Sequence, residues 1–138
     1  MGEIFVEIVL ENIEDRSDAR RGLIAEEAVR RETVQAVADT GAMMLALPED
    51  LVTRLGLSIV DSITTTYADG RRGELPVSDA LSIRIGDRRM ATECIVVPEG
   101  AEPLVGVLVM ERLDLVADPV NRTLGPRPES PDRPLLRV

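Results

Sequence analysis

A carboxylate, a hydroxyl and a glycine follow one another at Asp39, Thr40 and Gly41, directly after the apolar residues Val37 and Ala38. This pattern predicts a carboxylate at the end of a strand, on a tight loop where glycine lets another stretch of backbone approach closely. The Thr40 hydroxyl both donates and accepts hydrogen bonds and could hold that loop. The alternative interpretation is an ordinary Asp turn that closes a hairpin.

The side-chain inventory excludes several kinds of chemistry. The chain has no histidine, which excludes Ser-His-Asp and Cys-His catalysis and disfavours metal sites that depend on imidazole. Cys94 is the only cysteine and lies in an apolar stretch, so we expect a small buried hydrophobe. A net charge of −9 with only Phe5 and Tyr67 as aromatic residues makes the chain a poor nucleic-acid binder.

No stretch is apolar for the roughly 18 residues that a membrane span requires, so we expect no membrane contact. The first ten residues carry Glu3 and Glu7 and lack the basic start of an export signal. We therefore expect a cytoplasmic protein.

Apolar residues recur mostly with period two, which predicts a protein of short β-strands. Expected strands cover 3–11, 30–38, 81–85, 90–97, 115–117 and 122–124, and a hairpin joins 57–66 to 72–77 at the Asp69-Gly70 turn. A short helix is predicted between Pro48 and Gly56, because its first turn is acidic and its last turn is basic. The apolar stretch Leu104–Leu113 is compatible with strand or helix.

Two segments lack a regular pattern. Residues 12–28 are rich in charge and aperiodic, which favours a loop or a mobile insertion. Residues 125–138 contain four prolines, which favour a mobile or draped tail that the fold does not need. The domain is therefore expected to span residues 1–124 as an all-β fold, a small closed barrel or sandwich with one or two short helices.

The order of these motifs resembles the retropepsin-like aspartic proteases, the family of the retroviral proteases and their bacterial relatives. In that family a strand leads into Asp-Thr-Gly-Ala, as at Asp39, Thr40, Gly41 and Ala42, and leucine-rich segments follow, as at 45–57. A glycine-bearing hairpin called the flap comes next, and here it is similar to residues 66–73, with the candidate substrate contacts Tyr67, Ala68, Asp69 and Gly70.

Near the end, the family has two apolar residues and a glycine that pack beside the catalytic loop, followed by a short helix. The matching residues here are Leu104, Val105 and Gly106, followed by 107–113. The resemblance covers about residues 3–124. It implies a closed acid-protease barrel.

The resemblance also implies a chemistry, with Asp39 as the catalytic residue. An aspartic protease activates water between two carboxylates that share one proton. This chain has one such motif, so a homodimer would have to bring Asp39 of each copy to a twofold axis. The substrate would be a peptide or protein, and no metal or organic cofactor would be required.

The chain departs from the family in ways that keep alternatives open. Met43 and Met44 stand where retroviral members have acidic or polar residues that grip the peptide backbone, and Arg71 and Arg72 make the flap basic. A non-catalytic peptide-binding or scaffolding module of the same fold is therefore one alternative. An unrelated small β-domain with an incidental Asp turn is another.

Overall fold

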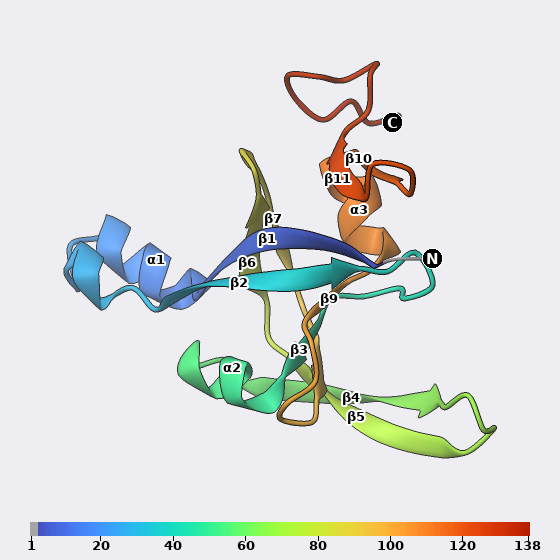
Figure 1. Cartoon of the computed structure of the whole chain (residues 1–138). Coiled ribbons are helices and arrows are strands. Elements are labelled where there is room, and N and C mark those ends of the chain that lie inside the picture. The colour runs from blue at the N-terminus through green and yellow to red at the C-terminus, as the bar shows by residue number, and fades with distance from the viewer. Residues whose placement is uncertain (1–2) are drawn as a thin grey trace.

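The computed structural model describes residues 3–138, which form mostly β structure with few short helices (Figure 1). The strands are β1 (Ile4–Glu11), β2 (Arg31–Ala38), β3 (Ala46–Pro48), β4 (Ile59–Thr66), β5 (Arg72–Ser78), β6 (Leu81–Ile85), β7 (Arg88–Thr92), β8 (Ile95–Val97), β9 (Leu104–Val105), β10 (Leu115–Asp118) and β11 (Thr123–Pro126). The helices are α1 (Ile13–Arg20), the 3₁₀ turn η1 (Glu26–Ala28), α2 (Glu49–Arg54) and α3 (Val107–Leu113). Within residues 3–138, none of them has the length and apolar character that crossing a membrane demands.

The nine strands β1 to β9 form one curled sheet in the order β4-β5-β8-β3-β9-β2-β1-β6-β7, and β10 pairs with β11 separately. Its outermost strands are β4 and β7, and no pairing joins these two edges in residues 3–138. The sheet is therefore a half-barrel. This confirms the all-β class but does not confirm the closed barrel that the sequence predicts.

The core is formed by apolar residues at alternate positions along the strands. In β1, Ile4, Ile8 and Leu10 are buried, and the alternate residues of β6 are buried likewise. Leu47 of β3 and Leu51 of α2 complete the core beside them. Burial of each such side chain stabilises the fold by about 1.5–3 kcal/mol.

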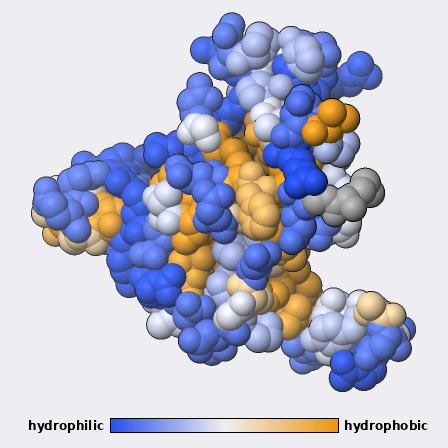
Figure 2. Space-filling model, viewed as in Figure 1, coloured by the Kyte–Doolittle hydropathy of each residue, from blue (hydrophilic) through white to orange (hydrophobic). Residues whose placement is uncertain are grey.

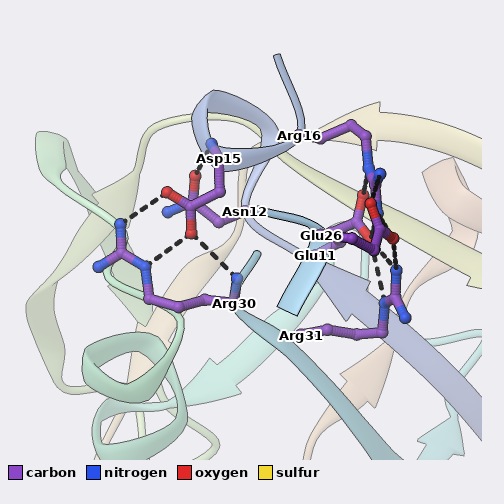
Figure 3. Close-up of polar contacts among 7 residues, drawn as sticks. All are labelled: Glu11, Asn12, Asp15, Arg16, Glu26, Arg30 and Arg31. Atoms are coloured by element: carbon purple, nitrogen blue, oxygen red, sulfur yellow. Dashed lines mark hydrogen bonds and ion pairs between the residues drawn. The ribbon is translucent and has the colours of Figure 1, made fainter. Parts of the chain in front are cut away.

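The expectation of a loop at residues 12–28 is wrong for Ile13–Arg20, which form α1. Asn12 caps this helix by accepting a hydrogen bond from the backbone N–H of Asp15 at 2.9 Å, and its amide donates to the carbonyl of Leu55 at 2.8 Å. The Asp15 carboxylate accepts from the Arg30 side chain at 2.7 and 3.0 Å (Figure 3). Caps and ion pairs thus fix a helix that has little apolar surface.

The predicted strand at 90–97 is two strands that pair with different neighbours. Its first part belongs to β7, which pairs with β6, and its last part is β8, which pairs with β3 and β5. Cys94 lies between them, fully buried, with its sulfur 3.2 Å from the hydroxyl oxygen of Ser78. Burial raises the pKa of the Cys94 thiol to about 11, as expected for an interior cysteine.

The proline-rich tail is draped over the body and not free of it. Its first residues belong to β11, which runs to Pro126 and so extends past the expected boundary at residue 124. Arg88 donates to the carbonyls of Leu113 and Asp114, both at 2.9 Å, and also to the carbonyl of Ser130 in the tail. The Asp114 carboxylate accepts from Arg127 at 3.1 Å and from the backbone N–H of Leu135 at 2.9 Å.

Candidate active site

Asp39 lies immediately after β2, where the short strand β9 runs parallel to it. The pairing aligns Val37 with Leu104 and Ala38 with Val105. The backbone N–H of Asp39 then donates to the Val105 carbonyl at 2.9 Å. The supporting segment expected at Leu104, Val105 and Gly106 is therefore in contact with the loop that carries Asp39.

Residues 39–45 connect β2 to β3 and are called the Asp39 loop below. Hydrogen bonds from backbone N–H groups within the loop hold its conformation. One carboxylate oxygen of Asp39, Oδ1, accepts the Gly41 N–H at 2.8 Å, and the Asp39 carbonyl accepts the Ala42 N–H at 3.1 Å. The other oxygen, Oδ2, has no hydrogen-bond partner within residues 3–138. The Thr40 hydroxyl is exposed and likewise makes no hydrogen bond there, so the support expected from Thr40 is not seen in the single chain.

Gly106 lets the backbone of the Asp39 loop lie directly against the start of α3. A Cβ at Gly106 would stand 2.6 Å from the backbone carbonyl carbon of Met43 and from the carbonyl oxygen of Met44. The first two N–H groups of α3, from Val107 and Leu108, donate to the carbonyls of Ala42 and Met43 at 2.8 and 3.0 Å. The loop thus supplies the acceptors that a capping side chain would otherwise provide. Motif reasoning did not identify these carbonyls, because main-chain acceptors carry no residue-type signal.

A shallow hollow of about 350 Å³ lies over the Asp39 loop and the first turns of α3. It is lined by Thr40, Gly41, Ala42, Met43, Val107, Leu108 and Glu111. Met43 is 70% exposed and Leu108 is 50% exposed, so two large apolar side chains face outward beside the candidate catalytic loop. Exposed apolar surface of this kind is typical of an interaction site.

The β4–β5 hairpin is the segment that the sequence identifies as a flap. Its strands pair from Ile59 with Ser78 to Thr66 with Arg72. It extends from the body on the same side as the loop after β2 (Figure 1), and an open notch separates it from the rest of the surface (Figure 2). The hairpin therefore has the exposed position that a lid requires, although motion of the hairpin stays a prediction.

Contacts within the hairpin shape its tip. The Tyr67 N–H donates to the Arg71 carbonyl at 2.8 Å, and Gly70 adopts a φ of +85° that favours glycine. Arg71 lies over the Tyr67 ring, 5.6 Å from its centroid, and pairs with Asp69 at 2.6 Å. A Cβ at Gly73 would stand 2.9 Å from that ring. Tyr67 therefore packs on its own hairpin.

Hydrogen bonds from the Arg71 backbone and side chain hold the pKa of Asp69 below its ordinary value. The Asp69 carboxylate therefore accepts hydrogen bonds from Arg71 at the tip of the hairpin, and Ala68 is exposed beside it. The four residues expected to contact substrate are all exposed: Tyr67, Ala68, Asp69 and Gly70. They lie together at the tip of the β4–β5 hairpin, separate from the Asp39 loop.

A second pocket of about 360 Å³, lined mainly by apolar residues, lies at the base of the β4–β5 hairpin. Its walls come from α2, β4, β5 and β8, and the apolar residues among them are Val52, Leu57, Ile59, Leu75, Pro76, Val96, Val97 and Pro98. Figure 2 shows apolar surface in a band across this face of the molecule, toward the base of the β4–β5 hairpin. The pocket could accept an apolar side chain of a bound chain.

The groups that could take part in chemistry at the Asp39 site are its carboxylate and nearby backbone groups. Within residues 3–138, no group of three or more Asp, Glu or Cys side chains is arranged to hold a metal ion. The half-buried Asp39 carboxylate has one oxygen fixed by an N–H group, and the other has no hydrogen-bond partner among the described residues. Such a group can accept a proton from water or donate one to a substrate oxygen.

Comparison with known protein families agrees with this geometry. A family model described as gag-polyprotein putative aspartyl protease matches residues 26–112. The chain therefore belongs to this aspartyl protease family, which confirms the resemblance drawn from the motifs. The match takes in the Asp39 loop, the β4–β5 hairpin and residues 104–106, and it ends within α3. No curated protein matches the chain.

Proposed function

We propose that the protein is a homodimeric aspartic endopeptidase that hydrolyses peptide bonds with water activated between two Asp39 carboxylates. The observation that carries this proposal is the Asp39 carboxylate at the end of β2, with Oδ1 held by Gly41 and Oδ2 free. It stands in a chain that belongs to an aspartyl protease family. Residues 1–124 would form the protease domain, and we place it in the cytoplasm.

The reaction needs one protonated and one ionised carboxyl, because two carboxylates held close together share a proton. The ionised Asp39 takes a proton from water as the water oxygen attacks the peptide carbonyl carbon. The protonated Asp39 of the other copy donates its proton to the carbonyl oxygen, which gives a tetrahedral diol. The first Asp39, which now carries the proton from water, donates it to the amide nitrogen, and the second Asp39 takes a proton from a diol hydroxyl. The C–N bond then breaks to give an amine and a carboxylic acid, and the pair again holds one proton. The rate should pass through a maximum on the acidic side of neutrality.

Three features support a dimer. A single chain supplies one Asp39, whereas the chemistry needs two. Met43 and Leu108 expose apolar side chains beside Asp39, where an isologous contact would cover them. The sheet is an open half-barrel, and we propose that the second copy closes the site.

The peptide would lie between the Asp39 loops and the flap. The flap tip carries exposed groups at Tyr67 and Asp69, and the apolar pocket at its base could hold a side chain of the peptide. Closure of such a hairpin would exclude water other than the attacking molecule. No metal or organic cofactor enters this proposal.

A second candidate is a non-catalytic peptide-binding or scaffolding module. Met43 and Met44 favour it, because they replace the polar residues with which retroviral relatives grip the peptide backbone. In this alternative the flap and the apolar pocket would hold a peptide without cleaving it. A confirmed dimer that cleaves no peptide from about pH 3 to pH 8 would support this alternative.

The test is Asp39→Asn, which keeps the size of the side chain but removes the proton acceptor. We expect cleavage of a denatured protein substrate to be abolished, while circular dichroism and sedimentation show an unchanged fold and dimer. Asp132→Asn, an exposed acid in the tail, is the matched control and should cleave like the wild type. Cleavage retained by Asp39→Asn would exclude the proposed mechanism.

A further inference from the structure

A cleft of about 470 Å³ lies at the opposite end of β2 from Asp39. It is lined by Glu11, Ile13, Arg16, Arg20, Arg31, Ser82, Arg84, Arg89 and Ala91. Arg31 starts β2 and Asp39 follows its end, so the two lie about 26 Å apart at the usual rise of a strand. The cleft is therefore separate from the candidate active site. Five arginines gather in it although the chain carries a net charge of −9.

Two of the five arginines are neutralised by carboxylates of the chain. Arg16 pairs with Glu11 at 2.8 Å and with Glu26 at 2.7 Å, and Arg31 pairs with Glu11 at 2.7 Å (Figure 3). This network fixes one wall of the cleft. It leaves Arg20, Arg84 and Arg89, none of which forms an ion pair with any carboxylate in the described part of the chain.

Arg84 and Arg89 occupy an unfavourable arrangement. The antiparallel register of β6 and β7 places them directly opposite each other, and both are exposed. Like charges at directly opposed positions of a sheet destabilise it. Arg20 adds a third unpaired charge from α1. An anion bound among the three guanidinium groups would reverse this repulsion, since arginine binds carboxylates through paired hydrogen bonds.

The surroundings favour one class of anion. No aromatic side chain lines the cleft, so nucleobases have no surface on which to stack. Ile13 and Ala91 add apolar contacts, and Ser82, only 6% exposed, adds a hydroxyl in the wall. In the part of the chain that the structure describes, strand β7 is the last of the sheet and pairs with β6 alone, so its outer edge can accept an extended chain through backbone hydrogen bonds.

We propose that this cleft binds an extended acidic peptide segment. Its backbone lies along the free edge of β7, and its carboxylates pair with Arg20, Arg84 and Arg89. The site is distinct from the Asp39 loop and does not depend on catalysis. In the intact protein it anchors an acidic stretch of a partner or substrate at a distance from the active site.

The test measures fluorescence anisotropy of a labelled peptide in which glutamate alternates with threonine over about ten residues, long enough to span β7. We expect binding that weakens as salt increases, and none to the same peptide with glutamine in place of glutamate. The double variant Arg84→Gln/Arg89→Gln should bind at least about tenfold more weakly, because two charge-assisted contacts are lost. Arg20→Gln alone should weaken binding by a smaller factor.

The matched control is Arg122→Gln/Arg133→Gln, which removes the same charge at exposed arginines outside the cleft. It should bind the acidic peptide like the wild type. Thermal unfolding of all variants shows that they remain folded. Equal weakening by both double variants, equal binding of the glutamine peptide, or no binding at all would overturn the proposal. Tighter binding of oligo(dT) through the same arginines would also overturn it, in favour of a nucleic-acid site.

Discussion

Main-chain contacts determine where the Asp39 carboxylate lies. Its own N–H reaches the Val105 carbonyl, and the N–H of Gly41 reaches the carboxylate. Gly106 allows the supporting segment to come this close, since a Cβ there would meet backbone atoms at 2.6 Å. The position of the proposed catalytic group, Asp39, is therefore sensitive to Gly106, a residue that has no side chain of its own.

At the residue scale we predict that Gly106→Ala displaces the Asp39 loop. The new methyl group meets backbone that cannot rotate away, so the free energy of unfolding should fall by about 1–3 kcal/mol. Peptide cleavage should fall with it. Gly125→Ala is the control, because nothing lies within 4 Å of its added Cβ. Urea denaturation of both variants measures the difference, and equal stability of the two would contradict this account of Gly106.

Motif order predicted Asp39, Gly41 and Gly106 as a group. A Cβ at Gly106 would meet backbone atoms of the loop at 2.6 Å, and a Cβ at Gly41 would stand 3.2 Å from the Asp39 carboxylate. The loop-holding role expected of Thr40 is not seen, because its exposed hydroxyl makes no hydrogen bond within residues 3–138. The opposed pair Arg84 and Arg89 was also missed. Their meeting depends on the register of β6 and β7, which a net charge of −9 does not reveal.

At the element scale, α1 shows where hydrophobic periodicity is not informative. The helix buries almost no apolar side chain, so the period that indicates a helix is missing. Another signal was present, because Asn12 followed by Glu14 and Asp15 is typical of a helix start. What fixes the element is long-range ion pairing, such as Asp15 with Arg30, and this cannot be read from local sequence.

We predict that this ion-pair network makes the fold sensitive to acid. Hydrogen bonds from Arg16, then from Arg31, lower the pKa of Glu11 from 4.5 to about 2. Its contribution to stability is therefore complete above the unfolded-state pKa and is lost as the pH falls from about 5 through about 2. The free energy of unfolding, measured by urea denaturation from pH 7 to pH 2, should decrease in that window.

Glu11→Gln should be less stable than the wild type at pH 7, and the difference should shrink toward pH 2. Glu74→Gln is the control, because Glu74 is exposed and forms no ion pair within residues 3–138. It should follow the wild-type curve. A constant difference between Glu11→Gln and the wild type at every pH would contradict the assignment of Glu11.

At the scale of the whole molecule, the proline-rich tail, residues 125–138, is bound to the rest of the fold by side-chain contacts. The buried Asp114 carboxylate is paired with Arg127, and hydrogen bonds from the Arg127 side chain and from the backbone N–H of Leu135 hold its pKa well below the usual range. Ser130 is itself buried and accepts from Arg88. These contacts argue against the dispensable tail that the prolines suggested.

We predict that a chain ending at Pro126 is less stable than the full chain. Truncation leaves the buried Asp114 carboxylate unpaired and removes an acceptor from Arg88, which should lower the free energy of unfolding by about 1–3 kcal/mol. Arg127→Ala in the full chain should reproduce most of the loss, and the exposed Arg133→Ala should reproduce none. An unchanged denaturation midpoint in the truncated chain would show that the tail does not stabilise the fold, and would contradict this prediction.

The sequence predicted β1 and β6 well, because the apolar face of each is buried, as Ile4, Ile8 and Leu10 are in β1. It did not predict β3, and it merged parts of β7 and β8 into one strand. It could not predict that the sheet stays open. Closure depends on whether β4 and β7 meet, which is set by long-range curvature and by any second copy rather than by local pattern.

The central claim is that one active site is made from two copies of Asp39. The most direct measurement mixes a fixed amount of wild-type protein with increasing Asp39→Asn protein, allows subunits to exchange, and follows peptide cleavage. A wild-type subunit that pairs with an Asp39→Asn subunit forms a mixed dimer with only one Asp39 carboxylate. At a ninefold excess of the variant, random pairing predicts a rate of roughly one tenth of the unmixed rate.

Asp132→Asn protein, added in the same excess, retains Asp39 and should raise the total rate. Sedimentation of the mixtures at the assay concentration verifies that dimers are present and that subunits exchange. A rate that declines with the fraction of Asp39→Asn is the result that the shared site predicts. A rate that stays constant while mixed dimers form would mean that each chain acts alone, and would contradict the account.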